Sequence, residues 1–134
     1  MADLTVSVDP NKKTILLVED EPAIMEVTAT MLRYMGYKVL RAFTPSLAIC
    51  LAKKYADEIH LLMTDVHMPE MSGRDLAGKI LLFLPGMKIL FMSGDVSDFL
   101  SPNKGFCNGV YVIQKPFCFN DLADILEKVW HRPA

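Results

Sequence analysis

Five short apolar runs, separated by amphipathic segments, form the main pattern of this chain. The runs are rich in aliphatic and β-branched residues and cover residues 14–19, 38–42, 61–65, 88–93 and 110–114. Continuous apolar runs of this length, between segments with helical spacing, are typical of parallel strands that are buried on both faces of a sheet. We therefore expect five strands that alternate with helices.

Helix signals mark the segments between the runs. Pro22 stands at a favoured first helical position, Gly36 is a C-terminal signal, and Thr44-Pro45 is an N-cap followed by proline. A third helix is expected to end near Pro85. The apolar residues expected to face the sheet are Ile24, Val27, Met31, Leu32 and Met35 in the first helix, Leu47, Ala48, Leu51, Ala52 and Tyr55 in the second, Leu76, Ile80 and Phe83 in the third, and Leu122, Ile125, Leu126, Val129 and Trp130 in the last.

The two least regular segments lie at residues 97–109 and at the N-terminus. Residues 97–109 contain the breakers Ser101–Gly105 and Asn108-Gly109, so any fourth helix there is expected to be short or irregular. Residues 1–13 show no clear periodicity, which predicts a linker or disordered N-terminus before one domain at 14–131. Strand–helix alternation with right-handed crossovers predicts an α/β fold, a doubly wound (βα)5 sandwich around a parallel five-stranded sheet.

Four of the apolar runs end at polar side chains. Glu19 and Asp20 stand at the end of the first run, Asp65 ends the third, Ser93 ends the fourth and Lys115 follows the fifth. In an open α/β sheet, ligands bind in the crevice outside the carboxyl ends of the strands. These five side chains are therefore expected to meet at one edge, where they suit a divalent metal ion and a phosphoryl group.

The chemistry of these groups is consistent with phosphoryl transfer. Mg²⁺ prefers oxygen ligands and commonly takes one or two carboxylates, which Asp20 and Asp65 could supply, with Glu19 at one remove. Lys115 supplies a mobile positive charge and Ser93 a hydroxyl donor for phosphoryl oxygens. An aspartate can itself act as the nucleophile and form an aspartyl-phosphate.

Taken singly, these residues also have simpler interpretations. A strand-terminal aspartate is often a helix N-cap, a Lys-Pro pair usually belongs to a loop, and Glu19-Asp20-Glu21 is also the pattern of a solvated acidic turn. The ordered set across four strand ends favours the site.

Composition excludes several classes of protein. At 134 residues, with 51% hydrophobic and 22% charged residues, the chain fits one globular domain. A net charge of −2 with scattered basic residues gives no nucleic-acid surface, and no apolar stretch approaches the roughly 20 residues that span a bilayer. The polar N-terminus is unlike a signal peptide. Cys50, Cys107 and Cys118 lack CxxC spacing, which favours free thiols in a reducing cytoplasm.

The motifs at the strand ends resemble those of the receiver domain of two-component response regulators. The resemblance covers about residues 14–130 and rests on Ile15–Pro22, Leu62–Gly73, Phe91–Gly94 and Gln114–Phe117. It implies a flavodoxin-like fold with strand order 2-1-3-4-5. Segments similar to Met-Ser-Gly and Gln-Lys-Pro-Phe are frequent in receivers fused to hybrid sensor histidine kinases.

The resemblance also implies roles for the site residues. Asp65 would accept a phosphoryl group from a histidine kinase or a histidine phosphotransfer protein. Asp20, Asp65 and the main-chain carbonyl of His67 would ligate Mg²⁺, with Glu19 reaching it through water. Ser93 would turn toward the phosphoryl group and Lys115 would bind it. Such a protein switches partner interactions and is not an enzyme beyond its own phosphorylation and dephosphorylation.

Two features depart from the family pattern. Three residues before Lys115 the family usually carries an aromatic residue that reports phosphorylation, and here that position is Val112. Tyr111 is adjacent, but the period of two along a strand places it on the opposite face. The second departure is the segment 97–109, because the fourth helix is normally part of the output surface. Output through the standard face is thus less expected than phosphorylation itself.

Other functions are alternatives to this one. A haloacid-dehalogenase-like Mg²⁺-dependent phosphatase needs a second acid two residues after its nucleophile, where this chain has His67. A flavodoxin-like cofactor binder needs a Ser/Thr-rich phosphate loop after the first strand, and a nucleotide hydrolase needs GxxxxGK[ST]. A non-phosphorylated interaction module on the same fold is a further alternative.

The remaining expectations concern output and the histidines. Because the chain ends just after the last helix, output is expected through a partner, a homodimer or a parent chain, with no direct nucleic-acid contact. His60 and His131 are expected to be surface residues. For His67 only the main-chain carbonyl is assigned a role, and a role for its side chain over the phosphorylation site is left open.

Overall fold

The computed structural model describes residues 13–95 and 110–131, and in these ranges it contains five strands and four helices. In chain order they are β2 (Thr14–Val18), α1 (Pro22–Tyr34), β3 (Lys38–Ala42), α2 (Pro45–Lys54), β4 (Leu61–Asp65), α3 (Gly73–Phe83), β5 (Lys88–Ser93), β6 (Val110–Gln114) and α4 (Phe119–His131).

The five strands form one sheet in the order β3-β2-β4-β5-β6, and every neighbouring pair is parallel. This confirms the predicted order 2-1-3-4-5 and the predicted strand positions, apart from Glu19, which lies one residue beyond β2. The predicted irregular fourth helix and the N-terminal linker fall mainly in 96–109 and 1–12, outside the described residues.

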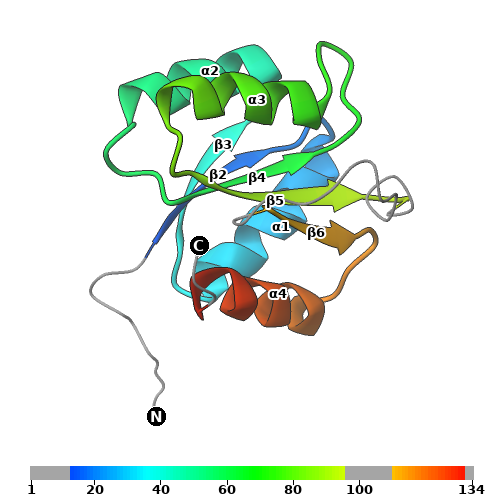
Figure 1. Ribbon diagram of the computed structural model, residues 1–134. Helices are drawn as coiled ribbons and strands as arrows, with labels where there is room; N and C mark the ends of the chain where they lie inside the picture. The colour runs from blue at the N-terminus through cyan, green and yellow to red at the C-terminus, as the bar shows by residue number, and fades with distance from the viewer. Residues whose placement is uncertain (1–12, 96–109, 132–134) are drawn as a thin grey trace, which may run out of the picture.

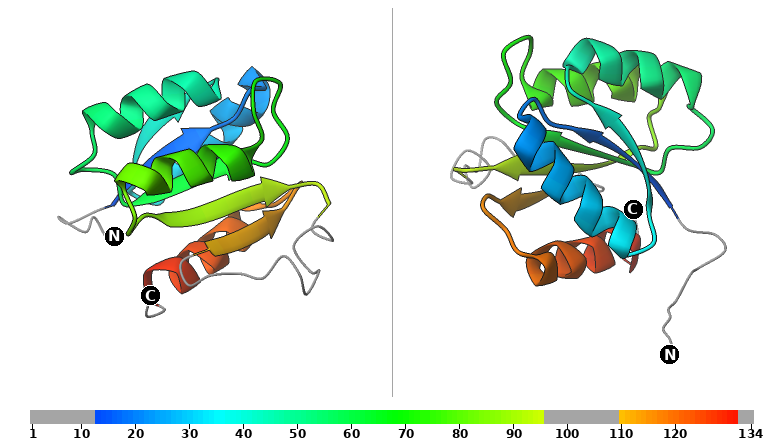
Figure 2. Two further views of the ribbon diagram at one scale, coloured as in Figure 1. Left: turned by 45° about the horizontal axis from the view of Figure 1, so that its top comes forward. Right: turned by 180° about the vertical axis from the view of Figure 1, so that it is seen from behind.

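Helices cover both faces of the sheet. Helices α2 and α3 lie on one face, and α1 and α4 lie on the other (Figure 1; seen from behind in Figure 2). Along β2, Leu16 and Val18 pack on the α2/α3 side, whereas Ile15 and Leu17 pack on the α1/α4 side. All four are fully buried, which explains why the strand reads as a continuous apolar run.

The ends of the helices follow the signals in the sequence. Gly36 has φ 101° and stands just past α1, where its N–H donates to the Arg33 carbonyl and the Tyr37 N–H donates to the Leu32 carbonyl. This pair of bonds is the Schellman motif, which favours glycine. Thr44 caps α2 as predicted, because its Oγ1 accepts a hydrogen bond from the Leu47 N–H at 3.1 Å.

The predicted inward faces of the helices were partly wrong. Val27 of α1 is 59% exposed, and Leu47 of α2 and Phe83 of α3 are 41% and 36% exposed. The buried residues of α1 include Met25 and Ala29 instead. The apolar residues of these helices form a stripe that is wider than the strip in contact with the sheet, so periodicity alone does not fix the rotation of the helix.

The first residue of β2 is joined to the residue before β4 by two hydrogen bonds. The His60 N–H donates to the Thr14 carbonyl at 2.9 Å, and the Thr14 N–H donates to His60 Nδ1 at 3.0 Å. His60 and His131 are exposed, as predicted, but the imidazole of His60 also accepts a hydrogen bond from the first residue of β2. None of the four described helices has the length and apolarity needed to cross a bilayer.

Candidate functional site

Parallel pairing brings the predicted polar residues to one edge of the sheet. Glu19 follows β2, Asp65 is the last residue of β4, Ser93 is the last residue of β5 and Lys115 follows β6. The register supports this placement, since Asp65 pairs with Met92 and Ser93 pairs with Gln114. These residues thus lie at the carboxyl ends of the strands, where their order in the sequence placed them.

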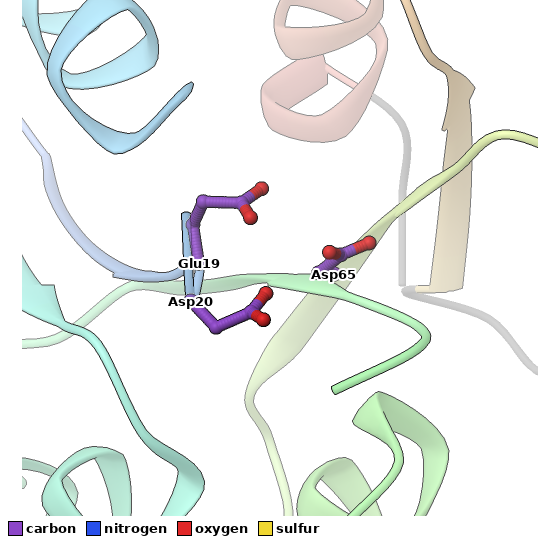
Figure 3. A group of neighbouring side chains, drawn as sticks. All are labelled: Glu19, Asp20 and Asp65. Atoms are coloured by element: carbon purple, nitrogen blue, oxygen red, sulfur yellow. The ribbon is translucent and has the colours of Figure 1, made fainter. Parts of the chain in front are cut away.

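Three carboxyl groups gather at this edge. One carboxylate oxygen from each of Glu19, Asp20 and Asp65 lies within 4.8 Å of the other two, near the ends of β2 and β4 (Figure 3). Glu19 is fully buried, and Asp20 and Asp65 are half-buried. A compact set of hard oxygen donors that remains partly open to solvent fits Mg²⁺, which binds through one or two carboxylates and keeps several waters.

Lys115 is the counter-charge of this cluster. Its Nζ lies 3.0 Å from Glu19 Oε1 and 3.3 Å from Asp65 Oδ2, and its side chain is 20% exposed. The main chain holds it in place, because the Lys115 N–H donates to the Ser93 carbonyl at 2.8 Å. The cation therefore reaches both the buried acid and the predicted phosphoacceptor.

Burial and charge act in opposite directions on this pair. Burial raises the pKa of Glu19, although the hydrogen bonds from Lys115 and the Glu21 N–H partly offset it. Burial alone would lower the pKa of Lys115, but its hydrogen bond to Glu19 and the charge of Asp65 outweigh burial and raise that pKa. Lys115 is consequently an ammonium at neutral pH.

Both carboxylate oxygens of Glu19 are already engaged. Oε1 accepts from Lys115, and Oε2 accepts from the Glu21 N–H at 3.2 Å. Asp20 and Asp65 are half-buried, whereas Glu19 is fully buried. This difference is consistent with Glu19 acting at one remove from a metal ion.

The hydroxyl of Ser93 is directed to the chain two residues further on. It is buried, and its Oγ donates to the Asp95 carbonyl at 2.9 Å and accepts from the Asp95 N–H at 3.1 Å. A role in binding a phosphoryl group would require this hydroxyl to exchange these bonds for new ones.

Gly73 is a site residue to which the sequence assigned no role. A Cβ atom built on Gly73 would lie 2.1 Å from the main-chain oxygen of Asp65, so only glycine allows α3 to begin this close to β4. The Gly73 N–H also donates to the Val66 carbonyl at 2.7 Å, and Thr64 Oγ1 donates to the Asp65 carbonyl at 3.0 Å. The feature of the sequence that could have indicated this role is a glycine at the first helical position, directly after the N-cap Ser72.

The structure also describes three further residues that the sequence singled out. His67 is exposed in the loop after Asp65. Val112 packs on the α2/α3 side of the sheet and Tyr111 on the α1/α4 side, which confirms that the two face opposite ways. The Tyr111 ring therefore lies on the face of the sheet opposite to Val112.

The sequence of this chain is similar to those of known proteins. Residues 15–127 match the family model described as the response regulator receiver domain. The chain is 32% identical over 117 residues to the response regulator receiver protein CpdR of Brucella abortus (strain 2308), a match that covers 87% of this chain and 96% of CpdR. It is 30% identical over 116 residues to the sensor kinase CckA of the same strain, of which it covers only 12%.

Solved structures give the same fold. The receiver domain from the hybrid histidine kinase CckA matches with a TM-score of 0.74 and 34% identity, over 87% of this chain and 97% of that one. The chemotaxis protein CheY4 of Vibrio cholerae matches with a TM-score of 0.79 over 88% of this chain and 98% of its own, and at 22% identity it supports the fold alone.

Proposed function

The chain belongs to the response regulator receiver family, and we propose that it accepts a phosphoryl group on Asp65 from a histidine kinase or a histidine phosphotransfer protein. The observation that carries this proposal is the position of Asp65. Its carboxylate shares the cluster with Glu19 and Asp20, and its Oδ2 lies 3.3 Å from the Lys115 ammonium. The proposed nucleophile, the proposed metal-binding oxygens and the Lys115 counter-charge therefore lie together at the end of β4.

In the proposed reaction a carboxylate oxygen of Asp65 attacks phosphorus. The new O–P bond forms as the P–N bond to the donor histidine breaks, and the electron pair of the P–N bond stays on the imidazole nitrogen. The imidazole leaves as a neutral group if its other nitrogen carries a proton, and otherwise it takes up a proton. Asp20, Asp65 and the His67 carbonyl would hold Mg²⁺, with Glu19 acting through water. A divalent ion held there would neutralise charge on the carboxylates and the phosphoryl oxygens.

Lys115 would exchange one partner for another during this step. At rest its ammonium bonds Glu19 and lies close to Asp65. When Asp65 becomes an acyl phosphate, its carboxylate charge moves outward onto phosphoryl oxygens, and the flexible lysine side chain can follow that charge. Ser93 would supply a hydroxyl to the same oxygens after leaving Asp95.

An apolar groove beside the site offers a place for the phosphodonor. A cavity of about 430 Å³ is lined on α1 by Ile24, Val27 and Met31 and on the other side by Lys115 and Phe117. Val27 is one of the residues wrongly predicted to face the sheet, and its exposure gives α1 an apolar outer surface next to the Lys115 cation. A histidine-bearing helix that packs in this groove would lie next to the site.

The domain limits 14–131 and a cytoplasmic location form part of the same proposal. The two cysteines in the described residues, Cys50 and Cys118, are free and exposed, which fits a reducing compartment. The similarity to CckA also fits a module of a hybrid kinase, whereas CpdR fits a stand-alone protein. In either case, the phosphorylated state would act by changing its contacts with a partner, the parent chain or a second copy.

One experiment separates this function from its alternatives. The protein is incubated with acetyl phosphate and Mg²⁺, and its intact mass is measured. A single added phosphoryl group supports the receiver function. Repeated hydrolysis of varied phosphomonoesters would support the haloacid-dehalogenase-like phosphatase instead, and no added mass together with no turnover would leave the non-phosphorylated interaction module.

A further inference from the structure

The first turn of α2 is capped by a residue from a distant loop. Pro45 has no N–H, and the N–H groups of Leu47 and Ala48 donate to Oγ1 and to the carbonyl of Thr44. The Ser46 N–H donates instead to Glu70 Oε1 at 3.1 Å, and the Ser46 hydroxyl donates to Glu70 Oε2. These donors lower the pKa of Glu70, and a carboxylate is favoured at a helix N-terminus.

Glu70 belongs to the loop that follows the phosphoacceptor. This loop, residues 66–72, begins directly after Asp65 and carries His67, whose carbonyl is the proposed third protein ligand of the metal. The main chain fixes its first residue, because the Val66 N–H donates to the Met92 carbonyl at 3.1 Å and the Val66 carbonyl accepts from Gly73. Glu70 ties the middle of the loop to α2 with two hydrogen bonds.

The same corner of the fold is bonded to the acidic turn. The Glu19 N–H donates to the carbonyl of Ala42 at 3.1 Å, and Ala42 ends β3 just before the cap of α2. The corner 42–46 therefore contacts both groups of proposed ligands: the Glu19-Asp20 turn through Ala42, and the loop of His67 through Ser46. This corner therefore adds a second connection between the two groups, beside the direct pairing of β2 with β4.

We propose that Glu70 is a positioning residue whose clamp on Ser46 sets the His67 carbonyl relative to Asp20 and Asp65, and thereby sets the affinity of the site for its divalent cation. This inference rests on the proposed function, since it concerns the same metal site. Residues that orient ligands without touching the metal typically change its affinity by about 10- to 100-fold.

The test is the affinity of the unphosphorylated full chain for Mn²⁺, measured by electron paramagnetic resonance. Glu70→Ala should weaken binding by about tenfold, and Ser46→Ala, which keeps the main-chain donor, should weaken it less. Glu70→Gln should stay close to the unmodified protein, because an amide can both accept from the Ser46 N–H and donate to its hydroxyl. Glu58→Ala is the matched control, since Glu58 is an exposed carboxylate paired with Lys38 on another part of the surface.

Each outcome decides the proposal. If Glu70→Ala lowers the urea midpoint but leaves Mn²⁺ affinity unchanged, Glu70 is only a helix cap and the proposal fails. Equal weakening in Glu70→Gln and Glu70→Ala would also overturn it, because the effect would then come from the lost charge. If the double variant Ser46→Ala/Glu70→Ala binds Mn²⁺ as tightly as Glu70→Ala alone, the two residues act through the same pair of hydrogen bonds, which supports the proposal. If the unmodified chain binds no Mn²⁺, the proposed function fails first and this inference falls with it.

Discussion

Lys115 Nζ lies 3.0 Å from Glu19 Oε1, although the two residues are 96 positions apart and two strands, β4 and β5, lie between theirs in the sheet. The buried carboxylate at the end of β2 thus depends on a cation from the edge strand. The same ammonium lies 3.3 Å from Asp65. One positive charge therefore pairs with both the buried Glu19 and Asp65, the proposed phosphoacceptor.

Replacing this cation should affect both stability and chemistry. Lys115→Met keeps the length of the side chain but leaves Glu19 buried without its counter-charge. We expect a loss of about 1–3 kcal/mol, less than for a fully buried pair, because Lys115 keeps partial exposure. Phosphorylation by acetyl phosphate should slow by about tenfold or more, since hydrogen bonds to charged groups are worth about 1.5–3 kcal/mol.

Urea unfolding and intact mass measure the two effects of Lys115→Met separately. Lys79→Met on the exposed side of α3 is the control for loss of a lysine charge. If Lys115→Met is unfolded, the main role of Lys115 is structural. If the variant is phosphorylated at the normal rate, Lys115 takes no part in the reaction.

The His60–Thr14 bond predicts a dependence of stability on pH. Burial and the charge of Lys13 lower the pKa of His60 below its ordinary value of 6.5. The unfolded chain therefore binds a proton at a higher pH than the folded chain does, and the folded state loses stability as the pH falls below about 6.5. A protonated Nδ1 also cannot accept the Thr14 N–H.

A substitution separates His60 from the carboxylates that titrate at lower pH. His60→Asn places an amide oxygen near the position of Nδ1, so it keeps an acceptor that does not titrate. The gap between the urea midpoints of the variant and the unmodified chain should shift in favour of the variant between pH 7 and pH 5. A constant gap across this range would contradict the prediction.

The candidate site was predictable because its residues lie at strand ends. Glu19, Asp65 and Lys115 each follow an apolar run, and parallel topology brings such ends together whatever the detailed packing. The fold was predictable because the hydrophobic pattern that defines each strand and helix extends over the whole element.

The supporting contacts were not predictable in this way. The bond between Glu70 and Ser46 joins two exposed residues 24 positions apart, and neither residue type signals a partner. The need for glycine at position 73 depends on how closely α3 approaches Asp65. The rotation of α1, which exposes Val27, is decided by packing rather than by periodicity.

Two glycines of α3 should respond in opposite ways to alanine. Gly73→Ala places a methyl group against the Asp65 carbonyl and should destabilise the fold by about 1–3 kcal/mol, with slower phosphorylation because Asp65 must shift. A Cβ atom on Gly78 would meet nothing within 4 Å beyond its own helix, so Gly78→Ala should stabilise the helix by up to about 1 kcal/mol. Urea unfolding of both variants measures the contrast, and equal effects would refute the close approach.

Asp65 should be the sole phosphoacceptor. Asp65→Asn keeps the volume of the side chain but removes its nucleophilic oxygen charge, so labelling by acetyl phosphate should fall to background while the fold survives. Circular dichroism checks the fold and intact mass checks the label. Undiminished labelling of the variant would place the reaction on another residue.

The last prediction ranks Asp20 above Glu19 in their contribution to Mg²⁺ affinity. Both oxygens of Glu19 already accept hydrogen bonds, from Lys115 and from Glu21, whereas Asp20 is half-buried at the open side of the cluster. Asp20→Asn should therefore weaken Mg²⁺ binding on the order of a hundredfold and Glu19→Gln by only about tenfold, as for a group that acts through an intermediary. Titration of Mg²⁺ followed by amide chemical shifts gives both affinities.

Removal of the metal ion completes this test. Excess chelator should abolish labelling of the unmodified chain by acetyl phosphate, because the repulsion between the phosphoryl group and the three carboxylates is then opposed by Lys115 alone among the site residues described. Labelling that is equal with and without chelator would contradict a metal-dependent reaction. A larger loss of affinity in Glu19→Gln than in Asp20→Asn would instead make Glu19 the direct ligand, which requires Lys115 to release it when the ion binds.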